Sequence, residues 1–111
     1  MSKRDPRVPL RHMLDFAREA ARFAEGKTRE DIENDRLLNL ALVHLIELVG
    51  EAANRVPREV RESLAGIPWA RIVGMRNRLI HGYDFVDYDI LWQTVVEDLP
   101  ALISALEEAA D

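Results

Sequence analysis

The chain has 111 residues, of which 48% are hydrophobic and 32% charged, a composition typical of one globular domain rather than a disordered segment. Its formal net charge of −5 argues against non-specific DNA binding as the main activity. The absence of cysteine excludes disulfides, thiolate zinc sites and cysteine nucleophiles. We therefore predict a single domain over residues 1–111.

The sequence does not indicate secretion or membrane insertion. The N-terminal residues are polar and lack the apolar core of a signal peptide. No uninterrupted apolar run reaches the ~18 residues of a membrane span. We expect a cytoplasmic protein with no membrane partner.

The first segments carry clear signals for helix boundaries. Residues 1–9 contain two prolines and are predicted to form an N-terminal arm. Apolar residues then recur at helical spacing over residues 10–24, and Gly26 is a natural stop. Thr28 and Asp31 have the spacing of a capping box, in which each side chain accepts a hydrogen bond from the other residue's backbone N–H.

Residues 36–55 form the most apolar segment, and Asn34 or Asp35 can cap it. A helix that is apolar nearly all round is buried nearly all round, so in a small bundle we expect a partner chain on its outer side. Most of its polar residues share one narrow stripe at helical spacing. This stripe consists of His44, Glu47, Glu51 and Asn54.

The rest of the chain also has helical patterns. Helices are predicted over residues 58–64, 69–80, 90–99 and 101–110. Gly82 suits a left-handed cap, and residues 84–89 are predicted to be a loop in which Asp87 or Asp89 caps the next helix. Pro100 either kinks one helix or begins a new one. Because no strand pattern is present, we predict an all-α bundle of four to five helices.

The stretch 75–83 concentrates groups suited to phosphate chemistry. Arg76 is a permanent cation, His81 an imidazole and Tyr83 a phenol. Three arginines and no acid occur in residues 69–81, and from there to the C-terminus the chain has neither Lys nor Arg. A local positive site in an acidic chain indicates a small anionic target.

Helical geometry places these side chains differently. At ~100° per residue, Arg76 falls inside the apolar arc of its segment, where a surface arginine is not expected. An ion pair with Glu47 or Glu51 explains this position, as does phosphate binding, and the two are compatible. Tyr83 lies about 20° from Arg76 if the helix continues, but His81 lies about 140° away. Arg76 and His81 meet only if the helix ends and the chain turns, or if a second copy of the chain completes the site.

These residues resemble the Arg-x4-His motif of the HEPN superfamily, with Asn77 following the arginine. The extension to Tyr83 resembles the Arg-x4-His-x-Tyr form of HepT-like toxins. The resemblance covers about residues 10–106. It includes Glu47 with Gly50-Glu51-Ala52-Ala53, Ile67-Pro68-Trp69, Met75-Arg76-Asn77, His81-Gly82-Tyr83 and Asp98-Leu99-Pro100. The motif alone often arises by chance, whereas this ordered combination is specific.

The resemblance implies a metal-independent endoribonuclease toxin that acts as a homodimer, with the motif at the dimer cleft and no cofactor. It also implies a cognate antitoxin of nucleotidyltransferase (MNT) fold that silences the toxin by attaching AMP to Tyr83. An AMP beside Arg76 would place a phosphate where the RNA phosphate binds. Without the resemblance, Tyr83 is explained as a boundary aromatic residue.

In the mechanism that follows, His81 removes a proton from an RNA 2′-hydroxyl or protonates the leaving 5′-oxygen. Arg76 stabilises the phosphorane-like transition state, and Asn77 orients His81 or the phosphate. Arg78 is predicted to be a solvated or RNA-facing cation. Taken alone, His81 is also explained as a helix C-terminal residue stabilised by the helix dipole. The alternative function is a non-catalytic HEPN module that binds nucleotide or serves a nucleotidyltransferase as a scaffold. The histidines lack metal-ligand spacing with nearby carboxylates, so no metal site is predicted.

Overall fold

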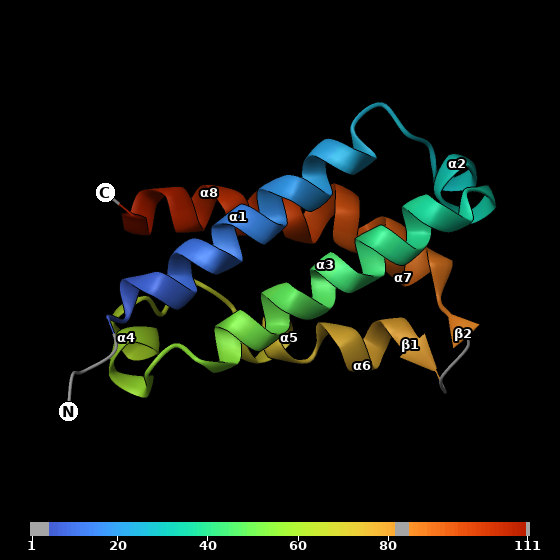
Figure 1. The fold of residues 1–111 in the computed structure, drawn as a ribbon. Coiled ribbons are helices and arrows are strands. Elements are labelled where there is room, and N and C mark those ends of the chain that lie inside the picture. The colour runs from blue at the N-terminus through green and yellow to red at the C-terminus, as the bar shows by residue number, and fades with distance from the viewer. Residues whose placement is uncertain (1–4, 82–84, 111) are drawn as a thin grey trace.

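The computed structural model describes residues 5–81 and 85–110, with only the backbone described for His81 and Ala110. Its elements are α1 (Arg7–Ala24), α2 (Arg29–Asn34), α3 (Arg36–Asn54), α4 (Arg58–Ser63), α5 (Trp69–Val73), α6 (Met75–Leu79), β1 (Ile80–His81), β2 (Phe85–Val86), α7 (Tyr88–Gln93), the π-helical turn η1 (Thr94–Asp98) and α8 (Leu99–Ala110). Four rods make up the bundle: α1, α3, α5 with α6, and α7 with η1 and α8 (Figure 1). The prediction of an all-α bundle is confirmed.

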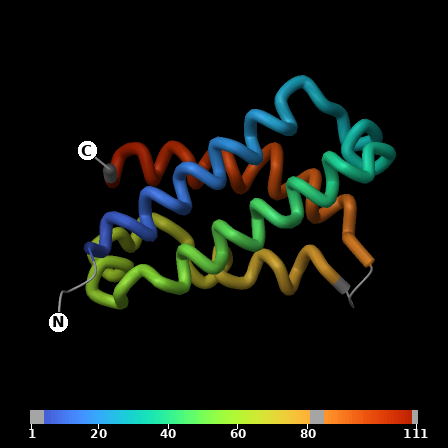
Figure 2. The backbone as a smooth tube through the Cα atoms, in the orientation of Figure 1, coloured from blue at the N-terminus to red at the C-terminus, as the bar shows by residue number. Residues whose placement is uncertain are grey.

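The rods enclose one hydrophobic core. α1 lies along α3 on one side and against α8 on the other, while α5 and α6 pack on α3 (Figure 2). α6 also contacts α7, which closes the ring of rods. The largest fully buried apolar side chains come from all four rods. They include Met13, Leu42, Ile46, Leu79, Leu91, Leu99 and Leu106.

The first helix starts earlier than predicted. α1 begins at Arg7, so the predicted arm over residues 1–9 is too long. Pro9 is tolerated because the first helical turn does not use its missing N–H. α1 ends at Ala24, shortly before Gly26, whose φ of 75° lies in the left-handed region that glycine adopts without strain.

Side-chain caps begin several helices. Thr28 Oγ1 accepts a hydrogen bond from the Asp31 backbone N–H at 3.0 Å, and the Asp31 carboxylate accepts one from the Thr28 N–H at 2.9 Å, which confirms the capping box. The hydrogen bond from the Thr28 N–H lowers the pKa of Asp31 below its ordinary value of 3.8. Asp35 caps α3 and Asp87 caps α7, each through a backbone N–H three residues further on.

The predicted helix over residues 69–80 is broken at Gly74. α5 ends one residue before this glycine and α6 begins one residue after it, since its ψ of 0° leaves the α-helical region. Gly50 of α3 lies against the end of α5: a Cβ there would sit 3.4 Å from the Ile72 carbonyl oxygen. The glycine thus allows α3 to approach α5 closely just before the break.

α6 ends at Leu79, and the chain continues as a short strand. β1 pairs with β2 in antiparallel register, with Ile80 opposite Val86 and His81 opposite Phe85. The predictions of no strand and of a loop over residues 84–89 were therefore wrong at β2 and at the start of α7. Strands of two residues leave no alternating pattern in a sequence. Gly82, the predicted helix cap, lies outside the described residues.

The last rod is one continuous helix with a widened turn, so of the two alternatives predicted for Pro100, one helix with an irregularity is the one that the structure shows. Within η1 the Leu99 backbone N–H bonds to the Thr94 carbonyl, five residues back. Pro100 follows at once, and it has no N–H to give to the helix. A proline ring also crowds the carbonyl four residues before it, and the wider π turn makes room for the ring.

α3 has the length and apolar character of a membrane-crossing helix, with a mean hydropathy of 1.3 and 44% of the relevant 18-residue window buried. It packs against α1, α2, α5 and α6, so a core position explains its composition. Within the single chain, Leu37 is 82% and Leu40 48% exposed, and the expected burial of this side by a partner chain stays a prediction. The predicted polar stripe is confirmed on its outer side: His44, Glu51 and Asn54 are exposed and Glu47 is half-buried.

Asn39 anchors the start of α3 in the core. Its side chain is 1% exposed, and its Nδ2 donates to the Ile32 carbonyl at 3.1 Å. Asn39→Ala should therefore lower the free energy of unfolding by about 1–3 kcal/mol, because a buried carbonyl loses its donor. Urea unfolding followed by circular dichroism measures this. The matched control is Asn54→Ala in the exposed last turn of α3, expected to change it by less than about 0.5 kcal/mol. Equal losses in the two variants would contradict this role for Asn39.

Candidate functional site

Arg76 is held by a carboxylate from another rod. Its Nε donates to Glu47 Oε2 of α3 at 3.0 Å, with side chains 57% and 29% exposed respectively. Of the two acids considered from sequence, Glu47 is therefore the partner; Glu51 lies exposed one turn further along α3. Among the described residues, the terminal nitrogens of Arg76 have no hydrogen-bond partner. They remain available to an anion from solvent.

The apolar side of α6 faces the core, which leaves its polar side outward. Met75 and Leu79 are 2% and 1% exposed, whereas Arg76 and Asn77 are exposed. The spacing of four between the buried residues fixes which face of the helix reaches solvent. Arg76 and Asn77 thus lie together on the surface, with Glu47 at their edge.

Arg78 is only partly solvated, and the alternative that it faces RNA stays a prediction. Its side chain is 34% exposed, and its Nη2 is buried 3.9 Å from Asp98 Oδ2 in η1. Arg71 of α5 donates from Nη2 to both oxygens of the same carboxylate, at 3.1 and 3.2 Å. Two of the three arginines in residues 69–81 therefore form ion pairs with Asp98, and the third, Arg76, forms one with Glu47.

The structure places the backbone of His81 in β1, two residues beyond the end of α6. His81 therefore lies just beyond the helix and not within it, and the condition under which Arg76 and Tyr83 share a helical face, that the helix continues to Tyr83, is not met. Tyr83 itself lies outside the described residues, as does the His81 side chain. Within residues 5–81 and 85–110, no group of three or more His, Asp or Glu side chains is arranged to hold a metal ion.

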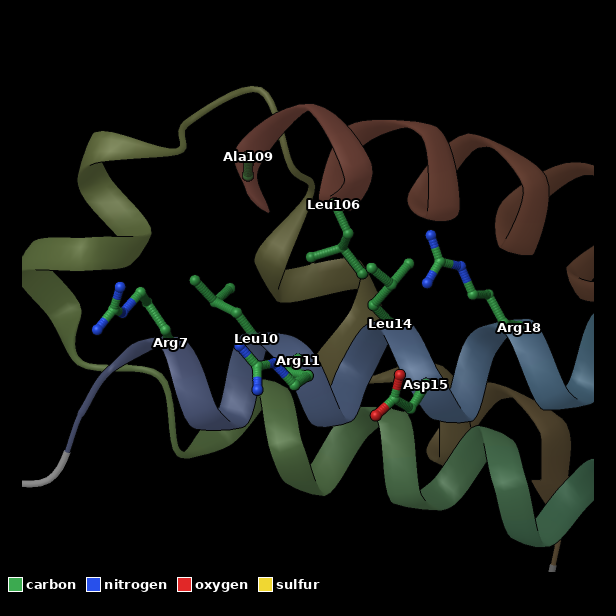
Figure 3. A pocket seen from close by; sticks show the side chains of 8 residues that line it. All are labelled: Arg7, Leu10, Arg11, Leu14, Asp15, Arg18, Leu106 and Ala109. Carbon is green, nitrogen blue, oxygen red and sulfur yellow. The ribbon is translucent and has the colours of Figure 1, made fainter. Parts of the chain in front are cut away.

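A groove of about 240 Å³ is lined by residues of α1 and α8 (Figure 3). Its lining combines apolar and charged side chains: Arg7, Leu10, Arg11, Leu14, Asp15, Arg18, Leu106 and Ala109. The charges are matched locally, since Arg7 pairs with Asp5 and Arg18 with Glu107, and Asp15 also lines the groove. This balance makes it a poor site for phosphate compared with the exposed Arg76.

Comparison with known proteins gives a consistent result. The family model Ribonuclease HepT-like matches residues 13–109. The chain is 37% identical over 103 residues to "Putative RNase TTE0752" of Caldanaerobacter subterraneus subsp. tengcongensis, covering 93% of this chain and 92% of that protein. It is 34% identical over 107 residues to "Putative RNase MJ1380" of Methanocaldococcus jannaschii, covering 96% and 98% respectively. It is 35% identical over 99 residues to "Probable ribonuclease HepT" of Thermococcus cleftensis, covering 86% and 90%. No solved structure matches the chain significantly.

The Arg76–Glu47 pair is too exposed to contribute much to stability. Glu47→Gln should change the free energy of unfolding by less than about 1 kcal/mol, because surface ion pairs are weak in water. Urea unfolding measures the change, with Glu51→Gln on the same stripe as the control. A loss above about 2 kcal/mol in Glu47→Gln would mean that the pair holds the fold together rather than orienting Arg76.

Proposed function

Because the chain belongs to the HepT-like ribonuclease family of the HEPN superfamily, we propose that it is an endoribonuclease toxin whose reaction depends on Arg76 and His81. The observation that carries this proposal is the state of Arg76. Its guanidinium is fixed through Nε by Glu47 while the rest of the group stays exposed. A cation oriented in this way can bind a phosphate without first being ordered by it.

The proposed reaction is transesterification within RNA. The 2′-oxygen attacks the adjacent phosphorus, its proton passes to a base, and the P–O5′ bond breaks as the 5′-oxygen gains a proton. The products are a 2′,3′-cyclic phosphate and a 5′-hydroxyl. His81 supplies the proton transfer, since imidazole titrates near neutral pH. Arg76 stabilises the extra negative charge on the phosphorane-like transition state, and Asn77 orients the phosphate or the imidazole beside it.

A homodimer would supply a second histidine to each reaction. One His81 acts as base while the His81 of a second copy acts as acid to the leaving oxygen. Exposed apolar residues support an association of this kind. They include Leu37 and Leu40 of α3, Val73 of α5 and Phe85 of β2.

We further propose that a nucleotidyltransferase-fold antitoxin neutralises this activity by transferring AMP to Tyr83, and that both proteins act in the cytoplasm. Tyr83 lies two residues after His81 in the sequence. An AMP phosphate at this position would compete with RNA phosphate for Arg76. The support for this part is the Arg-x4-His-x-Tyr spacing.

Loss of either proposed catalytic side chain should abolish RNA cleavage. Arg76→Ala and His81→Ala should each lower the cleavage rate by about 100-fold or more, because charge stabilisation and proton transfer contribute factors of this size. Cleavage of a labelled mixed-sequence RNA pool, with analysis of the product ends, measures this. The matched controls are His12→Ala and Arg22→Ala, both exposed on α1. If the two motif variants cleave as fast as the controls, the catalytic assignment fails.

Modification of Tyr83 should appear in the intact mass. After co-expression with a nucleotidyltransferase encoded beside this chain, the protein should gain about 329 Da per AMP and lose RNA cleavage. Peptide mapping should place the added mass on Tyr83, and Tyr83→Phe should remain unmodified and active in the same cells. An unmodified chain that is nevertheless inhibited would move neutralisation to physical occlusion by the antitoxin.

A further inference from the structure

The carboxylate of Asp98 contacts both sides of the break at Gly74 in the rod formed by α5 and α6, which we call the motif rod. Arg71 belongs to α5, before Gly74, and Arg78 belongs to α6, after it. Both reach Asp98 of η1: Arg71 Nη2 lies 3.1 and 3.2 Å from the two oxygens, and Arg78 Nη2 lies 3.9 Å from Oδ2. The same acid therefore contacts the helix on either side of the glycine.

The Arg78 end of this bridge is more shielded from solvent than the Arg76–Glu47 pair, whereas its Arg71 end is 45% exposed. The Asp98 side chain is 20% exposed, and Arg78 Nη2 is buried. Among the described residues, Arg78 Nη2 has no hydrogen-bond partner, so Asp98 is the nearest group that balances its charge. Partly buried charge pairs are screened less by water and salt than surface pairs, and they hold geometry more tightly.

The π turn determines where Asp98 sits. Thr94 is 2% exposed and donates from Oγ1 to the Ile90 carbonyl at 2.8 Å, which fixes the start of the turn. The Leu99 N–H bond to the Thr94 carbonyl then closes it across five residues, and Asp98 is its last residue. Its neighbour Glu97 is exposed and accepts a hydrogen bond only locally, from Gln93 Nε2 at 3.3 Å.

We propose that Asp98 is a positioning residue for the active site, acting through Arg71 and Arg78. By holding α5 and α6 together across Gly74, Asp98 fixes the orientation of α6. The orientation of α6 in turn determines where Arg76 lies and where β1 begins. Asp98 does not touch the Arg76–Glu47 pair, so its effect on the reaction is one of geometry. The catalytic consequence rests on the proposed ribonuclease function, whereas the effect on α6 does not.

The kinetic test compares Asp98→Asn with Glu97→Gln, a matched carboxylate-to-amide change in the same turn. On an oligoribonucleotide cleaved by the parent, Asp98→Asn should lower kcat about 10- to 100-fold with KM changed less than about threefold, because misplaced groups cost rate more than binding. Glu97→Gln should leave both unchanged. Asp98→Glu, which keeps the charge, should recover part of the kcat. A kcat for Asp98→Asn equal to that of Glu97→Gln would overturn the proposal.

A second measurement needs no activity. Amide hydrogen exchange in residues 75–80 should become about 10-fold faster in Asp98→Asn, while exchange in α1 stays as in the parent. If Asp98→Asn does not fold, Arg71→Gln tests the same bridge from its more exposed end. Unchanged exchange in residues 75–80 in the folded variant overturns the positioning role. If the unmutated protein cleaves no RNA but Asp98→Asn still speeds exchange in residues 75–80, the proposed function is refuted. The structural role of Asp98 in holding α6 would then stand.

Discussion

A helix of five residues cannot maintain itself in water, so α6 takes its place from what surrounds it. Met75 and Leu79 anchor its inner side in the core. On its outer side, Glu47 of α3 holds Arg76, and Asp98 of η1 holds Arg78. The short helix is thereby fixed relative to two different rods. The position of the motif residues on α6 thus depends on the packing of the whole bundle.

The carboxylates of Glu47 and Asp98 differ in their exposure to solvent and in the number of arginines they engage. Glu47 lies near the surface and engages only Nε of Arg76, so the rest of the guanidinium can accept an anion without displacing the carboxylate. Asp98 is more shielded and engages two arginines at once. In the proposed reaction, Glu47 therefore orients the arginine that binds phosphate, and Asp98 positions the helix that carries this arginine. Of the three arginines in residues 69–81, Arg76 is the most exposed.

Much of this arrangement could be predicted from the sequence. Thr28 and Asp31 revealed a cap by type and spacing, and Glu47 was one of the two acids predicted to pair with Arg76. The prediction that Arg76 falls inside the apolar arc was wrong, because the break at Gly74 leaves it on the exposed side of α6. The break at Gly74 could not be predicted, because a single glycine in a helical pattern is often tolerated. The strand at His81 could not be predicted either, since strands of two residues leave no alternating pattern in the sequence. The contacts of Asp98 with Arg71 and Arg78 were not predicted, because the arginines of residues 69–81 were interpreted as a site for an anion.

The π turn also has a consequence for how this chain can vary. A turn closed by a hydrogen bond between residues five apart contains one more residue than an α-helical turn. The π turn is therefore equivalent to an α-helix with one residue inserted. Everything after it is rotated by about 100° relative to a regular helix. Both the apolar seam by which α8 meets α1 and the reach of Asp98 to the motif rod depend on that single extra residue. Deleting or adding one residue in the π turn would therefore change both the packing of α8 on α1 and the contacts of Asp98 with the motif rod.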